Sequence, residues 1–303
     1  MLMPFELISP RSLDEAVSVI AARDDGCTVM AGGTDVLVAM HKGTLRPQCV
    51  IDIKDIEELQ GSPSYSEKGL IIPSLATHDE VEKTSEVEEC YTALKDAISQ
   101  IGSLQTRMRG TIGGNICNAA PSGDSIGALL VFDATLTLFG PDGWRTIAIA
   151  DFFCGPKQTT LLPGEILCSI SLPPVLGRTG SAYTKFSRRK AMDLALVGVA
   201  VSLGLDDEGV CNHARIALAT AAPTPIRAKT AEAYLNGKRL DESAPYECEE
   251  ALAEAAQLAL ADASPRSSWR SEADYRCRLI ETLVPRTAKK ALERLGKHPG
   301  RAE

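Results

Sequence analysis

The sequence of 303 residues lacks the short motifs that mark most nucleotide, metal and iron–sulfur sites. Neither Gly-x-Gly-x-x-Gly nor Gly-x-x-x-x-Gly-Lys-[Ser/Thr] occurs, so neither a Rossmann nor a P-loop site is predicted. The four histidines, His41, His78, His213 and His298, have no metal-ligand spacing and are expected to be surface or core residues. Nine cysteines occur without a Cys-x-x-Cys pair, which argues against an iron–sulfur cluster in this chain and against a disulfide framework.

A surplus of positive charge and a long apolar run are also missing. The net charge of −8 argues against sequence-independent binding to nucleic acid or to anionic membranes, which requires a concentrated basic surface. The longest uncharged apolar stretch, residues 194–205, is about a dozen residues long and too short to cross a bilayer. The N-terminal residues do not form a secretory signal. Because the spread cysteines indicate a reducing compartment, we expect a soluble cytoplasmic protein.

The remaining patterns predict a two-lobed first domain over residues 1–176. Ser12 and Glu15 match a capping box, with Ser12 as the N-cap and Glu15 reaching back to its amide, and apolar residues follow at helical spacing. In the first lobe, about residues 1–56, we expect a helix at 12–22, a strand at 27–31, a helix at 34–41 and a strand at 49–53. This alternation is typical of α/β structure.

The second lobe, residues 57–176, mixes strands and helices. Strands are predicted at 69–72, 135–139, 145–148 and 166–172, and helices at 77–82, 91–101 and 125–130. Two prolines and two glycines between 172 and 180 cannot continue regular structure and therefore predict a linker.

A C-terminal domain is predicted from 181 to 296. Strands at 181–186, 194–205 and 210–217 precede helices at 226–235, 245–261 and 273–295. This order predicts an α+β domain in which three antiparallel strands are covered by a helical layer.

Two stretches rich in glycine and short polar residues carry the strongest functional signal. The first reads Val29-Met30-Ala31-Gly32-Gly33-Thr34-Asp35 and begins in an apolar strand. The second runs from 111 to 124 and contains Thr111, Ile112, Gly113, Gly114, Asn115 and Asp124. Adjacent glycines let a backbone approach a ligand closely, and short polar side chains can hold it. Two such turns are expected to close on one long ligand from opposite sides.

Main-chain amides allow such turns to bind a diphosphate without Lys or Arg, because successive N–H groups and the positive end of a helix point at the oxygens. An acidic chain can therefore hold an anionic cofactor. Each Gly-Gly pair alone also fits an ordinary tight turn. Asp35 fits the N-cap of the next helix better than a phosphate contact, and Asn115 and Asp124 also fit turn-stabilising hydrogen bonds.

These residues resemble the FAD-binding medium subunit of the molybdenum hydroxylases, a family that includes carbon monoxide dehydrogenase and bacterial xanthine dehydrogenase. The resemblance lies in Ala-Gly-Gly-Thr-Asp at 31–35, in Thr-Ile-Gly-Gly-Asn at 111–115 with Asp124 behind it, and in the opening from Pro4 to Ala16. It covers nearly the whole chain. It implies a two-lobed FAD-binding domain of the PCMH type, α+β in class with α/β lobes, followed by the C-terminal domain of the medium-subunit type.

The resemblance also implies which residues contact the cofactor. Val29, Met30, Ala31, Gly32, Gly33 and Thr34 are expected at the adenine and diphosphate end of FAD, with Asp35 beside them on the ribose side. The family's second FAD-contacting stretch is matched by Thr111, Ile112, Gly113, Gly114, Asn115 and Asp124. Leu167 and Lys185 follow from the resemblance alone. Some relatives shield the flavin with an aromatic residue where this chain has Met192-Asp193-Leu194, so the identity of the electron acceptor stays open.

By the same resemblance, the function is electron transfer inside a molybdenum hydroxylase complex. A large molybdopterin-binding subunit oxidises the substrate, a small [2Fe-2S] subunit relays the electrons, and FAD on this chain passes them to NAD or another acceptor. A dimer of heterotrimers is expected. No catalytic acid, base or nucleophile is expected from this chain, because the flavin carries the chemistry.

Three other interpretations stay open. A free-standing FAD-dependent reductase needs a pocket in the C-terminal domain, for which Tyr183, Ser187 and Arg188 are the candidate residues. The string Gly123-Asp124-Ser125-Ile126-Gly127 fits the nucleophile elbow of a serine hydrolase, although turn formers rather than a strand precede it. The third is a non-catalytic module without FAD, in which the glycine turns are only structural.

Overall fold

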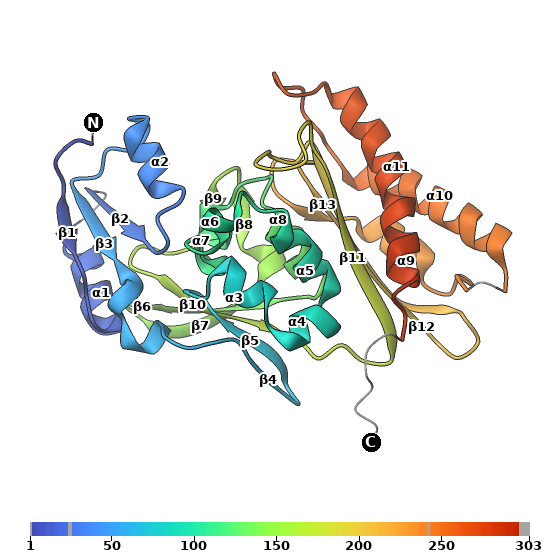
Figure 1. Cartoon of the computed structure of the whole chain (residues 1–303), viewed down its shortest axis with the longest axis horizontal. Helices are drawn as coiled ribbons and strands as arrows, with labels where there is room; N and C mark the ends of the chain where they lie inside the picture. Colours follow the sequence, from blue (N-terminus) through green and yellow to red (C-terminus); the bar gives the residue numbers. More distant parts are fainter. Residues whose placement is uncertain (1, 24–25, 242, 297–303) are drawn as a thin grey trace.

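Three β-sheets and a two-stranded ribbon organise the described part of the chain, residues 2–23, 26–241 and 243–296 of the computed structural model (Figure 1). The strand orders of the sheets are β1-β3-β2, β4-β5-β10-β6-β7 and β11-β12-β13-β14. The sheets follow one another along the long axis of the molecule, with the first lobe at one end and the C-terminal helices at the other. The mixed α and β composition that the sequence predicts is confirmed.

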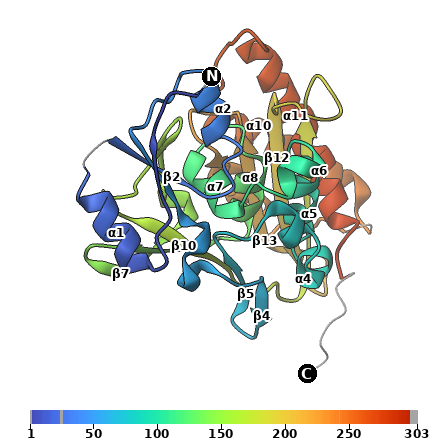
Figure 2. The same cartoon turned by 60° about the vertical axis from the view of Figure 1, so that its left-hand side comes forward.

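The first lobe is a small parallel sheet (Figure 2). β3 (Cys49–Asp52) lies between β1 (Glu6–Ile8) and β2 (Cys27–Met30), and both pairings are parallel. Because parallel neighbours need a crossover connection, α1 (Leu13–Ala21) and α2 (Val36–His41) join the strands. The predicted alternation of strands and helices is therefore present, with ends that differ by one or two residues.

Ser12 caps α1, but the predicted capping box is only half right. The Ser12 side chain accepts a hydrogen bond from the Glu15 amide at 3.2 Å. The Glu15 carboxylate accepts from the amide of Arg11 at 2.8 Å rather than from Ser12. The amide of Arg11, one residue before the N-cap, is therefore paired with Glu15 in place of the Ser12 amide. The helix still begins where the Ser12 pattern predicts.

The second lobe combines an antiparallel sheet with a set of short helices. The strands are β4 (Ser64–Ser66), β5 (Gly69–Pro73), β6 (Thr135–Gly140), β7 (Gly143–Ala148) and β10 (Ile166–Leu172), with β8 (Phe153–Gly155) and β9 (Gln158–Thr159) as a separate ribbon. The helices are α3 (His78–Glu82), α4 (Ser85–Glu89), α5 (Thr92–Ser99), α6 (Leu104–Arg107), α7 (Ile112–Asn118) and α8 (Asp124–Val131). Single 3₁₀ turns occur at η2 (Ile53–Asp55), η3 (Glu57–Leu59) and η4 (Ile149–Asp151).

The C-terminal sheet has four antiparallel strands, so the prediction of three is wrong. Its strands are β11 (Arg178–Phe186), β12 (Val197–Leu205), β13 (Cys211–Ala219) and β14 (Ile226–Arg227). β14 is two residues long, too short to show the alternation that identifies a strand in a sequence. β11 begins inside the predicted linker. The helices that follow are α9 (Lys229–Leu235), α10 (Pro245–Asp262) and α11 (Ala273–Leu292).

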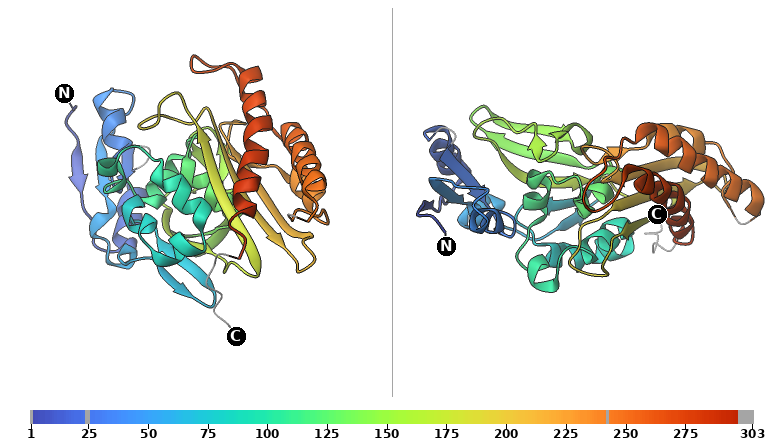
Figure 3. Two further views of the ribbon diagram at one scale, coloured as in Figure 1. Left: turned by 45° about the vertical axis from the view of Figure 1, so that its right-hand side comes forward. Right: turned by 90° about the horizontal axis from the view of Figure 1, so that it is seen from above.

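This sheet is covered on both faces, which explains the uninterrupted apolar run at 194–205 (Figure 3). Ala200 of β12 belongs to the core that contains α5 and α8, whereas Val199 and Val201 belong to the core that contains α10 and α11. All of β12 is buried. A strand with helices on both sides has no polar face, so its sequence is a continuous hydrophobic segment.

No helix within residues 2–23, 26–241 and 243–296 combines the length and the hydrophobicity that a bilayer span requires.

Asp96 of α5 ties the second lobe to the C-terminal domain. Its carboxylate accepts hydrogen bonds from Arg294 at 2.8 Å, from Lys290 at 2.9 Å and from the amide of Tyr183 at 3.1 Å. Burial alone would raise the pKa of Asp96, but the hydrogen bonds from Arg294 and Lys290 outweigh it and leave the pKa below its usual value.

We expect Asp96→Asn to lower the free energy of unfolding by about 1–3 kcal/mol at pH 7, because it removes hydrogen bonds to a charged group. A carboxyl group with a lowered folded pKa stabilises the fold above its unfolded pKa of about 3.9 and loses this effect as the pH falls. The difference from wild type should therefore disappear on acidification, as urea unfolding at several pH values would measure. Asp207→Asn, in an exposed turn, is the control. Equal behaviour of the two variants would contradict the prediction.

Candidate functional site

A cavity of about 1000 Å³ lies where the two lobes and the C-terminal domain meet. The first lobe contributes the loop after β2, the second contributes the segments around α3, α7 and β10, and the C-terminal domain contributes the end of β11 with the loop that follows. The volume is at the upper end of the range for small-molecule sites. The cavity therefore has room for a long ligand.

Most of the residues predicted from the sequence line this cavity. They are Val29, Ala31, Gly32, Gly33, Thr34, Asp35, Thr111, Gly113, Gly114, Asn115, Asp124, Leu167 and Lys185. Met30 and Ile112 are not among the lining residues. The Ile112 side chain is fully buried in the core of the second lobe, and its amide donates to the carbonyl of Ala76 at 3.0 Å. Ile112 is therefore a core residue rather than part of the cavity wall.

The first glycine stretch touches the segment that precedes the second one. A Cβ atom on Gly32 would lie 1.8 Å from the carbonyl oxygen of Arg109, a separation that no side chain tolerates. Gly33 has φ = +75°, in the left-handed region that favours glycine. The loop from β2 to α2 therefore takes a path that requires glycine at both positions, and the two glycine stretches lie together as the sequence predicts.

The amides of the first stretch are available to a ligand. Within the described part of the chain, no hydrogen bond uses the main-chain N–H of Gly32, Gly33 or Thr34 as its donor. Asp35 occupies the N-cap position of α2, as the sequence predicts, but its side chain makes no capping hydrogen bond. Its φ and ψ of −97° and −45° are already helical, whereas an N-cap residue is normally extended. A row of unpaired N–H groups beside a cavity is an anion-binding arrangement.

The second glycine stretch is the start of a helix rather than a turn. Thr111 is the N-cap of α7, and its Oγ1 accepts from the Gly114 amide at 3.0 Å. The Gly113 amide donates to the carbonyl of Ser74 and the Asn115 amide to the carbonyl of Thr111, both at 3.0 Å. These amides are already paired. The expectation that this stretch offers main-chain donors to a diphosphate is therefore wrong.

The two glycines of α7 instead allow close packing. A Cβ on Gly113 would lie 2.6 Å from the Cβ of Ser74, so Gly113 brings α7 against the segment after β5. A Cβ on Gly114 would lie 2.9 Å from Thr111 Oγ1, the hydroxyl that caps α7, and would meet nothing else within 4 Å; Gly114 lines the cavity. Gly114 thus keeps open a part of the cavity that any side chain would occupy.

Asp124 and Lys185 form a buried ion pair between the second lobe and the C-terminal domain. Lys185 Nζ lies 2.8 Å from Asp124 Oδ2, and both side chains are less than a tenth exposed, at 5% and 7%. The Tyr183 hydroxyl donates to Asp124 Oδ1 at 2.6 Å, and Lys185 also donates to the carbonyl of Gln100 at 3.2 Å. Burial raises the pKa of Asp124, although Lys185 and Tyr183 act in the opposite direction. The pair closes one wall of the cavity.

The hydrolase interpretation loses its nucleophile, and the reductase interpretation loses Tyr183, one of its three candidate residues. Ser125 is fully buried inside α8, and its hydroxyl donates to Asn115 Oδ1 at 2.8 Å, so the predicted hydrolase nucleophile is inaccessible. Tyr183 is buried against Asp124, and its pKa is raised well above the usual value by burial first and by Asp124 second. It cannot serve as the exposed proton donor that a free-standing reductase needs.

Two wall residues of the second lobe carry buried polar atoms that the sequence did not single out. Ser74 Oγ and His78 Nδ1 have no hydrogen-bond partner in the described part of the chain. Burial, and next the charge of Arg107, lower the pKa of His78 to about 4, so the imidazole is neutral at physiological pH. In the sequence, the capping box at Thr77 marks the start of α3, but it does not show in which direction the His78 side chain points.

The C-terminal domain supplies an aromatic residue that the sequence reading missed. Trp269 lines the cavity together with Met192 and Leu194, and it comes from the loop between α10 and α11. Arg266 and Arg270 of the same loop also line it. No local motif marks this loop, because it reaches the cavity only through the packing of α10 and α11.

The chain matches two known protein families in consecutive segments. Residues 3–175 match the family described as the FAD binding domain in molybdopterin dehydrogenase, and residues 181–291 match the CO dehydrogenase flavoprotein C-terminal domain. The chain belongs to the FAD-binding subunits of the molybdopterin dehydrogenases. It is thus a flavoprotein of an oxidoreductase family, as the resemblance in the sequence implies.

Relatives of this FAD-binding subunit match it over nearly its whole length. The xanthine dehydrogenase FAD-binding subunit of Escherichia coli O157:H7 is 35% identical over 288 residues, which is 94% of this chain and 95% of the relative. The carbon monoxide dehydrogenase medium chain of Hydrogenophaga pseudoflava is 32% identical and covers 96% and 98%. A solved structure of that carbon monoxide dehydrogenase superposes with a TM-score of 0.91 at 32% identity, covering 98% of this chain and 100% of the other.

We expect Lys185→Met to lower the free energy of unfolding by about 3–5 kcal/mol at neutral pH, because it leaves the Asp124 carboxylate buried without its cation. The pKa of Asp124 should then rise further. A group with a raised folded pKa favours the fold when protonated, so the loss should shrink as the pH falls below that pKa. Urea unfolding between pH 5 and pH 8 measures this trend. The double variant Lys185→Met with Asp124→Asn should recover part of the stability, and no recovery would contradict the pairing.

Proposed function

We propose that this chain is the FAD-carrying electron-transfer subunit of a molybdenum hydroxylase complex, receiving electrons from [2Fe-2S] clusters of a partner and delivering them to a separate acceptor. The observation that carries the proposal is the single cavity shared by both glycine stretches, with unpaired amides at Gly32, Gly33 and Thr34 on its wall. The chain's membership of an FAD-binding family supports the same conclusion.

The cavity residues fit FAD. Unpaired amides of the first stretch suit the diphosphate, and the Thr34 hydroxyl on the same wall adds a further donor. Val29 and Leu167 supply apolar surface for a ring, and Gly114 leaves space for the chain of the cofactor. When bound, FAD supplies the two-electron and one-electron chemistry that protein side chains lack. The protein's part is to bind it, to orient it and to exclude water.

Charge balance in the cavity indicates that these residues bind and position the cofactor rather than take part in catalysis. Asp124 neutralises Lys185, and Tyr183 orients the Asp124 carboxylate, so the wall presents a fixed dipole instead of a mobile acid or base. Asp124, Lys185 and Tyr183 would keep this wall in one arrangement while the cofactor changes its charge.

We place this subunit beside a large molybdopterin-binding chain and a small [2Fe-2S] chain, in a dimer of heterotrimers in the cytoplasm. The support is that relatives of the same length are named as subunits or medium chains of dehydrogenases, including caffeine dehydrogenase subunit beta of Pseudomonas sp. (strain CBB1). All nine cysteines are free thiols, which agrees with a reducing compartment. Co-purification of molybdenum and iron with the tagged chain from its native host tests the assembly.

We expect Gly114→Val to weaken FAD affinity by about a hundredfold, the equivalent of about 2.7 kcal/mol, because its side chain enters the cavity. The measurement is the ratio of flavin absorbance to protein after purification, with the dissociation constant from fluorescence titration. Gly26→Val, in the same molecule but beside Gln48 and outside the cavity, is the matched control. Thermal unfolding of both variants measures whether the fold persists, because the added Cβ at position 114 also approaches Thr111 Oγ1. Normal flavin content in Gly114→Val, or a wild-type chain that takes up no FAD, would overturn the proposed function.

A further inference from the structure

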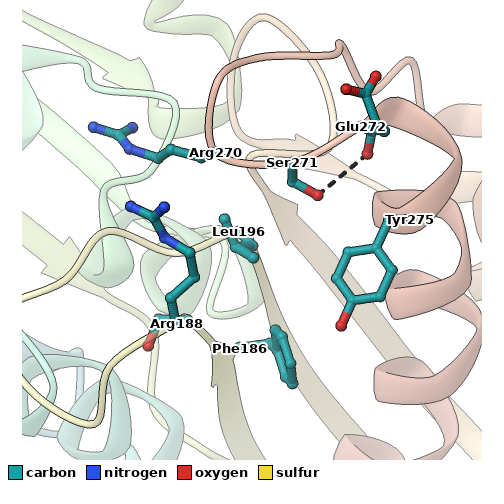
Figure 4. A pocket seen from close by; sticks show the side chains of 8 residues that line it. Phe186, Arg188, Leu196, Arg270, Ser271, Glu272 and Tyr275 are labelled. Carbon is teal, nitrogen blue, oxygen red and sulfur yellow. Dashed lines mark hydrogen bonds between the residues drawn. The ribbon is translucent and has the colours of Figure 1, made fainter.

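The groove of about 570 Å³ beside the cofactor cavity belongs to the site already described (Figure 4). Arg188 and Arg270 line both spaces. Their guanidinium carbons lie 4.8 Å and 4.9 Å from the centre of the Trp269 ring, which also lines the cavity. A separate chemical feature lies in the first lobe, where Cys27 and Cys49 stand side by side and line neither space.

Cys27 and Cys49 are direct neighbours on two parallel strands. The register of β2 and β3 pairs Cys27 with Cys49, and among the strand pairings of the described residues this is the one that joins two cysteines. Cys49 is buried in the core of the first lobe, and Cys27 packs against that core. Both side chains therefore lie on the same face of the sheet.

The spacing of the two strands suits a disulfide. Neighbouring strands lie about 4.7–4.9 Å apart, and the Cα atoms of a disulfide are usually about 4.4–6.8 Å apart. Each cysteine is the first residue of its strand, next to a loop, so the strand ends can make the small approach that an S–S bond requires. The two thiols already interact. Burial first, and then a hydrogen bond with Cys27, raise the pKa of Cys49.

The two thiols differ in their access to solvent. Cys49 is 3% exposed, whereas Cys27 is half-buried. The Arg23 guanidinium lies near both sulfurs: its hydrogen bond to Glu6 is the main reason that the pKa of Arg23 is raised, and the charges of the two thiolates add to it. For the Cys49 thiolate, the attraction of Arg23 exceeds the repulsion by Glu6. A cation beside a partly exposed cysteine favours the thiolate, which is the form that reacts with oxidants.

We propose that Cys27 and Cys49 are a reversible redox pair, in which hydrogen peroxide oxidises the two thiols to a disulfide. The Cys27 thiolate attacks one peroxide oxygen, the O–O bond breaks, and the products are a sulfenic acid on Cys27 and one water. The Cys49 thiol then attacks the Cys27 sulfur, so that the S–S bond forms, the S–O bond breaks and a second water leaves. The two thiols lose two electrons and two protons, and one hydrogen peroxide becomes two waters.

The disulfide closes a loop that contains the free amides of the cavity. Residues 28–48 lie between the two cysteines and include Gly32, Gly33 and Thr34, whereas the sulfurs are at the opposite ends of β2 and β3 from the cavity. Oxidation therefore restrains this loop without placing any atom in the cavity. In a reducing compartment the pair rests as two thiols, and disulfides formed there are usually transient or redox-sensing.

The test is peptide mapping of the full-length chain after treatment with a few equivalents of hydrogen peroxide. Remaining thiols are blocked with iodoacetamide before digestion with trypsin, which puts the two cysteines on separate peptides, residues 24–42 and 43–54. We expect mass spectrometry to find these peptides joined, lighter than their sum by two hydrogen atoms, and separated again by dithiothreitol. The bridge should form at least about tenfold faster than the exposed thiol of Cys154 is oxidised, because Cys154 has no thiol neighbour in register.

Three variants identify the partners. Cys49→Ala should form no bridge and should accumulate a sulfenic acid on Cys27, which dimedone traps. In Cys27→Ser, the Cys49 thiol should stay reduced, because it is buried. Cys154→Ser is the matched control and should form the bridge as wild type does. Circular dichroism of each variant shows whether it is folded, and the wild-type map decides the outcome even if a variant is not.

Three results would overturn the redox pair. The first is a wild-type chain whose two thiols stay reduced under these conditions, and the second is a bridge from either residue to a different cysteine or to a second chain. The third is a folded Cys49→Ala variant without sulfenic acid on Cys27. None of these results depends on bound flavin, so the outcome is independent of the proposed function.

Discussion

The contact of Gly32 with the backbone at Arg109 is the constraint on which the cavity depends. An added Cβ would lie 1.8 Å from the Arg109 carbonyl oxygen, so this approach of two main chains exists only because the residue is glycine. It fixes the loop after β2 against the segment that leads into α7. The free amides of the first lobe and the open space at Gly114 in the second then face one cavity.

The C-terminal domain completes the cavity through polar contacts rather than through one hydrophobic interface alone. Lys185 reaches Asp124, and Asp96 receives Arg294 and Lys290, so charged pairs bridge the domains at two separate places. A buried pair such as Lys185–Asp124 adds little net stability, but it penalises any other docking geometry, because that geometry would leave a buried charge without its partner. Apolar packing of β12 and β13 on α5 and α8 supplies the driving force, and the ion pairs set the orientation.

Much of the candidate site was predictable from the sequence, for a local reason. Gly32 and Gly33 follow a short apolar strand and precede a helix, and together with the second glycine stretch this order indicates a ligand-binding loop. The second stretch lies where the sequence predicts, but it begins a helix rather than a turn. Thr111 accepts a hydrogen bond from the Gly114 amide and starts α7, although two adjacent glycines disfavour a helix in the sequence. The fourth strand of the C-terminal sheet escaped notice because Ile226 and Arg227 are too few to show a period.

The sequence by itself determined most of the longer elements, the two glycine stretches and the family, since each of these depends on residues that are neighbours along the chain. Only the tertiary structure decided which amides are free, which side chains are buried without partners, and that Trp269, Arg188 and Arg270 meet at one rim. Along the sequence, most of the C-terminal domain lies between residues 188 and 270. Their contact depends on how α10 and α11 pack on a four-stranded sheet, and no local pattern encodes such a long-range packing geometry.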